Sequence, residues 1–300
     1  MTRVYAIPLH TRFRRTDVRE GLLLRGPCGW GEFSPFPEYP PAVCARWLAA
    51  AEEAANRPWP PARRTRIPVN VTVPAVGAEQ AHRIVSGSGC RTAKVKVAEP
   101  GQTAADDLAR VEAVRDALGW TGRLRVDANG AWDIGTAVRM IRRLEAFDLE
   151  YVEQPVASLA EMAALRRRVD VPLAVDESVR TAQDPLRVAG QLRSQAPVGL
   201  EAADVVVLKV QPLGGVHAAL RVAEAGGLPV VVSSALETSV GLAAGVALAA
   251  ALPELPYACG LGTVSLLTGD VVAEPLVPVD GGLAVRRPQV DEVALVRHEA

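Results

Sequence analysis

Residues 123–155, RLRVDANGAWDIGTAVRMIRRLEAFDLEYVEQP, decide the fold of this chain. The stretch contains two short apolar runs, at 123–128 and 149–155, which predict buried β-strands. Between them, residues 134–147 carry apolar side chains at helical spacing. Because a strand, a helix and a second strand in this order form a parallel βαβ unit, the stretch predicts an α/β fold.

The same alternation continues on both sides of this stretch. Helical spacing recurs at 104–118 and 215–226. Eight strands joined by crossover helices favour a closed parallel barrel, with an open doubly wound sheet as the alternative. No G-x-G-x-x-G motif follows the first strand, which argues against a dinucleotide-binding open sheet. The six further runs that predict strands lie at 67–73, 92–97, 172–177, 204–210, 228–234 and 256–260.

The N-terminal segment, residues 1–66, lacks this alternation. Strand-like runs at 4–9 and 21–26 and an alanine-rich helix at about 42–55 predict a small α+β capping domain. The tail, about residues 270–300, contains an Asp280-Gly281 turn of the kind found in hairpins, and we expect it to return to this domain. The barrel domain is then residues 67–269.

A proline-rich loop in the capping domain carries three aromatic residues, Phe33, Phe36 and Tyr39. Its prolines forbid a regular element there. Either the rings fill the core of the capping domain, or the loop forms a lid over a pocket. The local pattern favours the first alternative.

Composition narrows the classes of function. The 33 Lys and Arg residues balance 34 Asp and Glu residues, so no overall field recruits nucleic acid or an anionic membrane. We therefore expect a small-molecule partner, and the oligomeric state stays open. The four cysteines form no C-x-x-C pair, and Pro8 interrupts the N-terminal apolar run, so we expect a cytoplasmic protein.

Charged residues end several of the predicted strands, where a buried parallel strand is normally apolar. Asp127, Glu153 and Asp176 close three consecutive strands. Because the carboxyl ends of parallel barrel strands open on one face, these acids should be neighbours. Three carboxylates without nearby Cys or His suit a hard cation, so we predict a Mg²⁺ site, with Mn²⁺ as a possible substitute. Any one of these acids alone is better explained as a helix cap or ion-pair partner.

Basic residues accompany this acidic cluster. Lys94 and Lys96 lie two residues apart on the second predicted strand and therefore share one face, while Lys209 ends the sixth strand. Arg125 shares a face with Asp127, and either binds a substrate carboxylate or forms a structural salt bridge. A divalent cation between amines suits removal of a proton next to a carboxylate, because the resulting enediolate carries extra negative charge. A lysine base needs a lowered pKa, which a neighbouring ammonium such as Lys94 provides.

These motifs resemble the enolase superfamily, in its muconate-lactonizing branch. The resemblance covers nearly the whole chain and rests on K-x-K (94–96), D-A-N-G-A-W (127–132), E-Q-P (153–155), D-E-S (176–178) and Lys209. Within that branch, four further motifs look like those of the o-succinylbenzoate synthases of menaquinone biosynthesis. They are G-E-F-S-P-F (31–36), V-N-V-T-V-P (69–74), S-S-A-L-E-T-S-V-G (233–241) and G-L-G-T (260–263).

The resemblance implies a capping domain on a modified (β/α)7β barrel, and a lyase that dehydrates 2-succinyl-6-hydroxy-2,4-cyclohexadiene-1-carboxylate to o-succinylbenzoate. Mg²⁺ would be held by Asp127, Glu153 and Asp176. Lys96 would act as the base and Lys209 would steady the enediolate, with Lys94 beside them. The same resemblance implies substrate contacts from Arg125, Ser234, Gly260 and Gly262, a lid formed by residues 33–39, and support of the metal ligands by Asn129 and Glu177.

Alternatives remain at this point. The absence of K-x-H on the second strand argues against the mandelate racemase branch, and the absence of D-x-D on the eighth strand argues against dipeptide epimerisation. N-succinylamino acid racemase, which uses both lysines, stays open. So do a Schiff-base aldolase acting through Lys209 and a non-catalytic barrel, the latter disfavoured because every member of the charged set is present.

Overall fold

The computed structural model describes residues 2–192 and 201–300. The chain divides into two compact units. The first comprises Met1–Pro68, Leu208–Arg221 and Val232–Ala300, and the second Val69–Val207 and Val222–Val231. The division after Pro68 is close to the predicted boundary between residues 66 and 67. Residues 208–221 and 232–269, which are part of the predicted barrel domain, lie in the first unit. The predicted domain organisation therefore stays a prediction.

The first unit is built on a three-stranded antiparallel sheet of β1 (Thr2–Phe13), β2 (Thr16–Gly26) and β3 (Gly29–Phe33). The runs predicted at 4–9 and 21–26 lie in β1 and β2. Helix α1 (Pro41–Asn56) packs against β2 and β3 and contains the helix predicted at about 42–55. Its proline at the first position suits a helix start, because that N–H has no partner within the helix.

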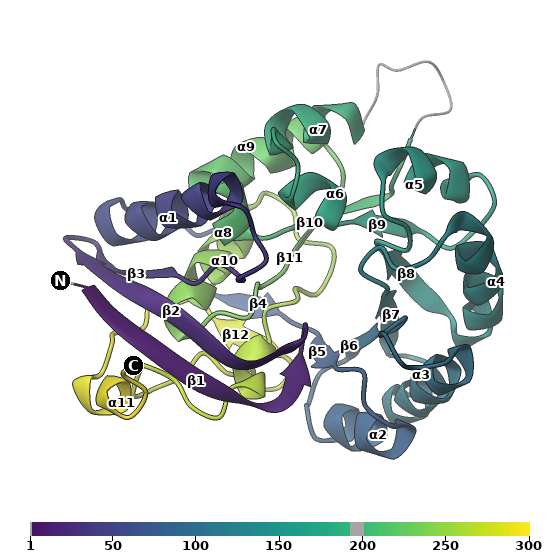
Figure 1. The fold of residues 1–300 in the computed structure, drawn as a ribbon, viewed down its shortest axis with the longest axis horizontal. Coiled ribbons are helices and arrows are strands. Elements are labelled where there is room, and N and C mark those ends of the chain that lie inside the picture. Colours follow the sequence, from purple (N-terminus) through teal and green to yellow (C-terminus); the bar gives the residue numbers. More distant parts are fainter. Residues whose placement is uncertain (1, 193–200) are drawn as a thin grey trace. The chain divides into compact units, whose positions relative to one another are not determined.

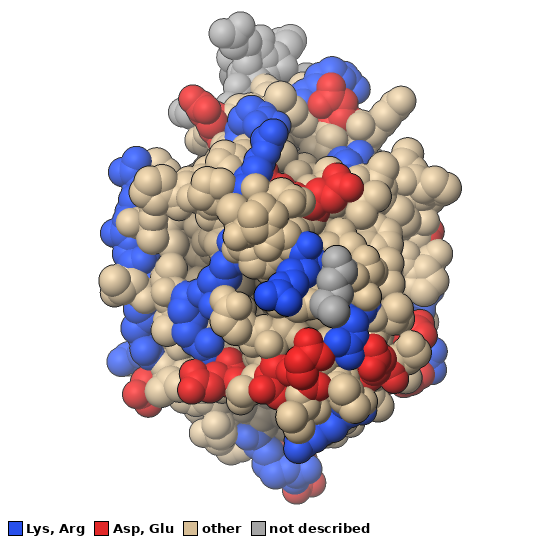
Figure 2. Space-filling view, turned by 90° about the vertical axis from the view of Figure 1, so that its left-hand side faces the viewer, with Lys and Arg blue, Asp and Glu red and all other residues tan. Residues whose placement is uncertain are grey.

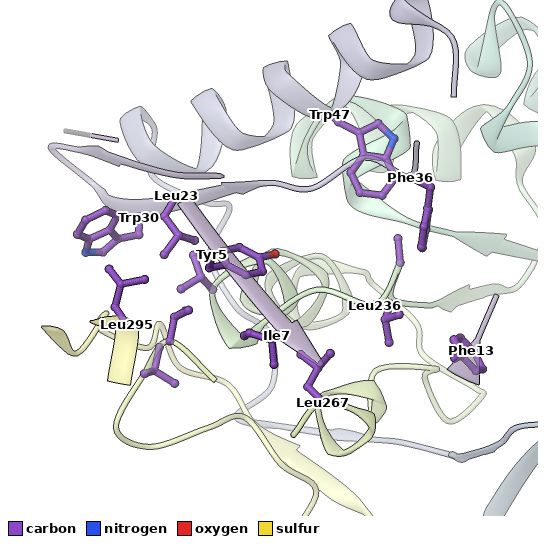
Figure 3. Close-up of a cluster of buried hydrophobic side chains, with 14 of the residues drawn as sticks. Tyr5, Ile7, Phe13, Leu23, Trp30, Phe36, Trp47, Leu236, Leu267 and Leu295 are labelled. Atoms are coloured by element: carbon purple, nitrogen blue, oxygen red, sulfur yellow. The ribbon is translucent and has the colours of Figure 1, made fainter. Parts of the chain in front are cut away.

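The aromatic loop contributes to the core of the first unit (Figure 3). Phe36 is buried, and its ring packs edge-on against Tyr39 and Trp47 at centroid distances of 5.9 and 6.1 Å. Edge-to-face contacts of this kind add to the free energy gained by burying the rings. The loop therefore fills the core, as the local pattern favours, and its closure as a lid stays a prediction.

The remaining elements of the first unit come from the C-terminal part of the chain. Helix α10 (Ser239–Ala251) is apolar on all sides and completely buried. In the tail, Asp280 and Gly281 both have positive φ, of 47° and 68°, which confirms the predicted turn. The tail also returns to the N-terminal sheet, where a bridge pairs Tyr5 with Glu299. The other elements are β4 (Arg66–Pro68), α8 (Val210–Leu213), η2 (Thr263–Leu266), β12 (Gly282–Ala284) and α11 (Glu292–Val296).

The second unit contains a seven-stranded sheet in the order β11-β10-β9-β8-β7-β6-β5, flanked by helices (Figure 1). The pairs from β5 to β10 are parallel. Its strands are β5 (Val71–Val73), β6 (Thr92–Lys96), β7 (Arg123–Asp127), β8 (Leu149–Glu153), β9 (Leu173–Val175), β10 (Val205–Leu208) and β11 (Val230–Val232). Its helices are α2 (Ala78–Ser86), α3 (Ala104–Leu118), α4 (Ile134–Leu144), η1 (Glu145–Phe147), α5 (Leu159–Arg166), α6 (Glu177–Arg180) and α7 (Pro185–Leu192). Helix α9 (Val216–Gly226) is divided between the two units after Arg221.

Two predicted strands differ from the structure. The run at 67–73 divides into β4, which pairs antiparallel with β12, and β5, which pairs parallel with β6. The run at 256–260 is not a strand but a short connection. Cys259 N donates to Pro68 O at 2.7 Å and Gly260 N donates to Val232 O at 2.8 Å. The prediction of a full eighth strand is therefore wrong, because this run forms isolated bridges at Cys259 and Gly260, the latter to Ser233, and no continuous ladder.

Local sequence explains where the helices of the second unit begin. Thr103 and Asp106 form a reciprocal capping box at the start of α3, and Ser158 and Glu161 form another at α5. Such caps satisfy N–H groups that have no partner inside the helix.

Within the described residues, no helix has the length and apolar character needed to cross a membrane. On the face shown in Figure 2, basic and acidic side chains are interspersed.

Candidate active site

Three acidic side chains of the second unit lie where consecutive strands end. Asp127 ends β7 and Glu153 ends β8, and the two residues are directly paired in the sheet register. Asp176 follows the last residue of β9. All three residues have an exposed fraction of 0 %, although a buried carboxylate is costly unless it is paired or hydrogen-bonded. Asp127 and Glu153 are therefore neighbours, and Asp176 follows the adjoining strand β9, while the meeting of all three side chains at one site stays a prediction.

Two lysines from β6 satisfy most of this buried negative charge. Lys94 Nζ lies 3.1 Å from Asp127 Oδ2 and 2.8 Å from Glu153 Oε1. Lys96 Nζ lies 2.6 Å from Asp127 Oδ2 and 2.6 Å from Asn129 Oδ1. The two ammonium groups thus share one face of β6, as their spacing predicts, and both reach the same carboxylate.

The two lysines differ in the direction of their pKa shifts. Burial lowers the pKa of Lys96, the Asp127 carboxylate opposes this, and the Lys94 ammonium lowers the pKa further, so the net shift is below the usual 10.5. Burial also lowers the pKa of Lys94, but Asp127 and Glu153 together raise it well above 10.5. Lys94 is therefore a permanent cation, and Lys96 is the more readily deprotonated of the pair.

A second group of contacts surrounds Asp176. Arg180 Nε donates to Asp176 Oδ1 at 2.8 Å, one helical turn further along the chain. Arg180 also contacts Glu177 at 2.5 Å, and Glu177 Oε1 accepts a bond of 3.0 Å from Asn129 Nδ2. Asn129 N in turn donates to Asp127 Oδ1 at 3.1 Å. Asn129 and Glu177 thus link the surroundings of two predicted ligands, and their role in supporting a metal site stays a prediction.

The donor set has the chemistry that a hard cation requires. Asp127, Glu153 and Asp176 offer only oxygen atoms, and all three are buried. As they stand, Lys94 and Arg180 neutralise these carboxylates. Among the residues described, no three acidic, histidine or cysteine side chains are close enough together to hold an ion. The residues fit Mg²⁺ by ligand type, and the metal site stays a prediction.

Arg125 lies in β7, two residues before Asp127, and has an exposed fraction of 0 %. Its Nε donates to Glu150 Oε2 at 2.5 Å, its Nη1 donates to Asn70 Oδ1 at 3.3 Å, and its guanidinium stacks on the Tyr151 ring at 4.7 Å. These are the contacts of the structural salt bridge, the second of its two expected roles. A substrate contact by Arg125 stays a prediction.

The other predicted site residues belong to the first unit. Lys209 is buried and immediately precedes α8, one residue beyond β10. Ser234 Oγ lies 2.5 Å from Thr263 Oγ1, and Ser234 N donates to Gly260 O at 2.9 Å. Gly262 immediately precedes η2. Ser234 and the segment that contains both glycines are therefore neighbours within this unit.

Sequence reasoning missed three residues of these clusters. Arg180 binds Asp176 and Glu177, and its spacing of three and four residues on one helix was the available signal. Thr263 contacts Ser234 and belongs to the G-L-G-T motif. Gln154, in the E-Q-P motif, has a buried side chain that accepts from the backbone N–H of Asp176 at 2.9 Å.

Comparisons with known proteins show which family this chain belongs to. The model for the enolase C-terminal domain-like family matches residues 77–289, and that for the enolase N-terminal domain-like family matches residues 4–55. The chain is 67 % identical to an o-succinylbenzoate synthase of Thermobifida fusca, over 99 % of this chain and 91 % of the relative. It is 55 % identical to an o-succinylbenzoate synthase of Mycolicibacterium smegmatis, over 97 % of this chain and 87 % of the relative.

Solved structures show the same fold. A muconate cycloisomerase from Pseudomonas fluorescens has a TM-score of 0.81 at 24 % identity, covering 100 % of this chain and 97 % of that one. An N-succinyl Arg/Lys racemase from Bacillus cereus has a TM-score of 0.81 at 20 % identity, with the same coverage. The predicted fold class, a barrel-type α/β sheet with an α+β N-terminal domain, is confirmed.

Proposed function

We propose, from the premise that this chain belongs to the o-succinylbenzoate synthases of the enolase superfamily, a Mg²⁺-dependent dehydration in which Lys96 is the base. The chain is an enzyme, a hydro-lyase. The proposed substrate is 2-succinyl-6-hydroxy-2,4-cyclohexadiene-1-carboxylate, and the products are o-succinylbenzoate and water. The reaction would serve menaquinone biosynthesis in the cytoplasm, and the expected partner is this small-molecule carboxylate, with no nucleic acid and no membrane.

One observation carries the proposal: the Lys96 ammonium is held at 2.6 Å by both Asp127 and Asn129, at the end of a parallel strand. Lys96 is fixed at the carboxyl end of β6 and has a pKa below its usual value. Both properties suit a base that takes a proton from a bound substrate. The neutral Lys96 amine would take the proton from the ring carbon that bears the carboxylate. The C–H electrons then move onto that carboxylate as an enediolate.

The second half of the reaction uses the same side chain. The protonated Lys96 would donate its proton to the departing hydroxyl, so that the C–O bond breaks and water leaves. The enediolate electrons return to the ring, which becomes aromatic. Because the gain in aromatic stabilisation favours this direction, one base on one face is sufficient.

The residues Asp127, Glu153 and Asp176 would hold Mg²⁺, the ion that enzymes of this superfamily generally use. When bound, the ion supplies positive charge that stabilises the enediolate oxygens. Asn129 and Glu177 would keep the ligands in place through the bonds described above. Lys94 would stay protonated and bind the carboxylates from the β6 side, which keeps a positive charge beside Lys96.

The remaining assignments concern the substrate. Lys209 would stay charged and steady the enediolate, while Ser234, Gly260 and Gly262 would contact the substrate. We assign Arg125 the structural role, because its buried guanidinium already binds Glu150. This differs from the substrate contact that the family resemblance implies for it.

Racemisation of N-succinylamino acids is the second candidate. The specific observation in its favour is that the chain keeps both Lys96 and Lys209, the pair that a two-base transfer needs. A paired experiment separates the two activities. The purified chain with Mg²⁺ is given the cyclohexadiene acid in one sample and an N-succinyl L-amino acid in D₂O in the other.

We expect rapid formation of o-succinylbenzoate in the first sample. Deuterium entry and loss of optical rotation in the second sample would show that the racemase activity is also present. Racemisation without dehydration would contradict the proposed function. Inactivation by borohydride in the presence of substrate, unaffected by chelator, would instead support the Schiff-base aldolase.

A further inference from the structure

Gln154 joins three segments of the second unit that follow the strands β7, β8 and β9, where the proposed metal ligands lie. Its backbone O accepts from Gly130 N at 2.6 Å, in the loop after β7. Its side-chain Nε2 donates to Val156 O at 2.8 Å, in its own loop after β8, and to Ser178 Oγ at 2.7 Å, after β9. The loops after Asp127 and Glu153 and the first turn of α6, after Asp176, thus meet at one residue.

The acceptor end of the same side chain binds the backbone of a proposed ligand directly. Gln154 Oε1 accepts from Asp176 N at 2.9 Å and from Ser178 N at 3.2 Å. Asp176 has φ −128° and ψ −78°, outside the helical and extended regions, as the chain turns from β9 into α6. The bond from Gln154 therefore fixes the peptide that determines where the Asp176 carboxylate points.

No apolar side chain of similar length can replace this one. The position needs an acceptor for two N–H groups and a donor for one carbonyl and one hydroxyl, and an amide is the neutral group that offers both. Gln154 is completely buried, so each group left without its partner would lose a hydrogen bond that water does not replace. Its backbone is also held at a φ of +37°, in the left-handed region that is uncommon for residues other than glycine.

We propose that Gln154 is a positioning residue that sets the geometry of Asp176 as a Mg²⁺ ligand and couples it to the loops after β7 and β8. The inference rests on the proposed function, because it takes Asp176 to be a ligand. It adds a residue that touches neither the ion nor the substrate but controls the affinity for the ion. Loss of such a supporting contact typically weakens metal binding by about 10- to 100-fold.

The experiment measures Mg²⁺ binding by isothermal titration calorimetry on the full chain, without substrate. We expect Gln154→Met to raise the Kd for Mg²⁺ at least about tenfold. Gln211→Met is the matched control, because Gln211 is also a buried glutamine, bonded to Gly241 O at 3.0 Å in the first unit. It should change thermal stability but leave the Kd for Mg²⁺ unchanged.

Hydrogen exchange of the metal-free protein gives a second, independent readout. In Gln154→Met the amides of Asp176 and Ser178 should exchange faster than in the parent chain, whereas in Gln211→Met they should not. If Gln154→Met fails to fold, Ser178→Ala removes only the hydroxyl partner of Nε2. It should weaken Mg²⁺ binding by about fivefold, the equivalent of one net hydrogen bond of ~1 kcal/mol.

The outcomes separate the inference from the proposed function. A parent chain that does not bind Mg²⁺ overturns the proposed metal site and with it this inference. A parent chain that binds Mg²⁺, beside a folded Gln154→Met variant with the same Kd, overturns the inference alone. Equal weakening in Gln211→Met would also overturn it, because the effect would then be one of general stability.

Discussion

The Lys96 ammonium lies 2.6 Å from Asp127 Oδ2, and the two residues are register partners on the neighbouring strands β6 and β7. The proposed base and a proposed metal ligand are therefore in direct contact. Their backbone positions are set by the parallel ladder rather than by a flexible loop. A catalytic group built on strands is held more precisely than one on a loop, which suits a reaction that depends on one proton position.

Lysine is rare in this chain. Of its 33 basic residues, Lys94, Lys96 and Lys209 are the only lysines, and every other one is arginine. Arginine cannot give up its proton at the pH of the cell, whereas a buried lysine can. Of the three, Lys96 is the one proposed to exchange a proton, and this role requires an amine, whereas Lys94 and Lys209 are proposed to stay charged.

Exchange of Lys96 and Lys209 for arginine tests their different roles. Lys96→Arg keeps the positive charge beside Asp127 but removes the base, so we expect kcat to fall by about 10²–10⁴-fold. Lys209→Arg keeps the charge that is proposed to steady the enediolate, and it should retain most of the activity. Steady-state kinetics on the cyclohexadiene acid, with circular dichroism to verify folding, gives the comparison. An active Lys96→Arg enzyme would refute the base assignment.

Removal of one carboxylate tests the metal site. Asp176→Ala should weaken Mg²⁺ binding, because the site loses one of three proposed ligands, and should leave Arg180 without its buried partner. Calorimetric titration with Mg²⁺ measures the change. Asp204→Ala, which removes an acid that pairs with Arg166 in the same unit, is the control and should bind Mg²⁺ normally. An unchanged titration for Asp176→Ala would rule out its role as a ligand.

The role of Arg125 can be decided by a double-mutant cycle with Glu150. Breaking a buried ion pair from one side typically costs about 3 kcal/mol or more, so we expect Arg125→Met to lower the free energy of unfolding by about that amount. The variant Arg125→Met with Glu150→Leu should recover part of the loss, and KM should change little throughout. A large rise in KM for Arg125→Met at unchanged stability would favour the substrate contact instead.

A buried carboxyl in the first unit should make stability depend on pH. Burial raises the pKa of Glu237 to about 7, and the nearby Glu32 carboxylate adds to the shift while Arg19 opposes it. The unfolded chain releases this proton near pH 4.5, so the folded state binds more protons between pH 4.5 and 7. The protonated Glu237 therefore adds its full contribution to the free energy of unfolding below pH 4.5, and this contribution is lost as the pH rises to 7.

The shift in the pKa of Glu237 corresponds to a loss of about 3 kcal/mol in the free energy of unfolding over this pH range. Glu237→Gln stays neutral at every pH, so its free energy of unfolding should fall less steeply than that of the parent chain over the same range. Urea unfolding at several pH values provides the comparison. Identical slopes for the two proteins would show that Glu237 is ionised in the folded state.

Much of the fold follows from local pattern. The strands at 92–96, 123–127 and 149–153 and the helix at 104–118 lie where the short apolar runs and the helical spacing predict them. The run at 256–260 is apolar as well, yet it forms a connection. Its hydrogen bonds go to Pro68 and Val232, which lie far away in the sequence, and local spacing carries no information on such partners.

The candidate site was predictable in part for a related reason. Charges at the ends of buried strands are conspicuous in a sequence, and this signal finds Asp127 and Glu153. The contacts of Gln154 and the choice of Glu150 as partner for Arg125 depend on loops and neighbouring strands that meet only in the folded chain. An uncharged residue such as Gln154 also gives no signal in the sequence comparable to a charge at the end of an apolar strand.

Metal-dependent turnover of the cyclohexadiene acid tests the central claim most directly. The purified chain is treated with EDTA, freed of chelator and assayed for o-succinylbenzoate before and after addition of Mg²⁺, with Lys96→Arg in parallel. We predict no turnover after EDTA, recovery with Mg²⁺ in the parent chain, and no recovery in the variant. Turnover by the metal-free chain, or recovery in Lys96→Arg, would contradict the account.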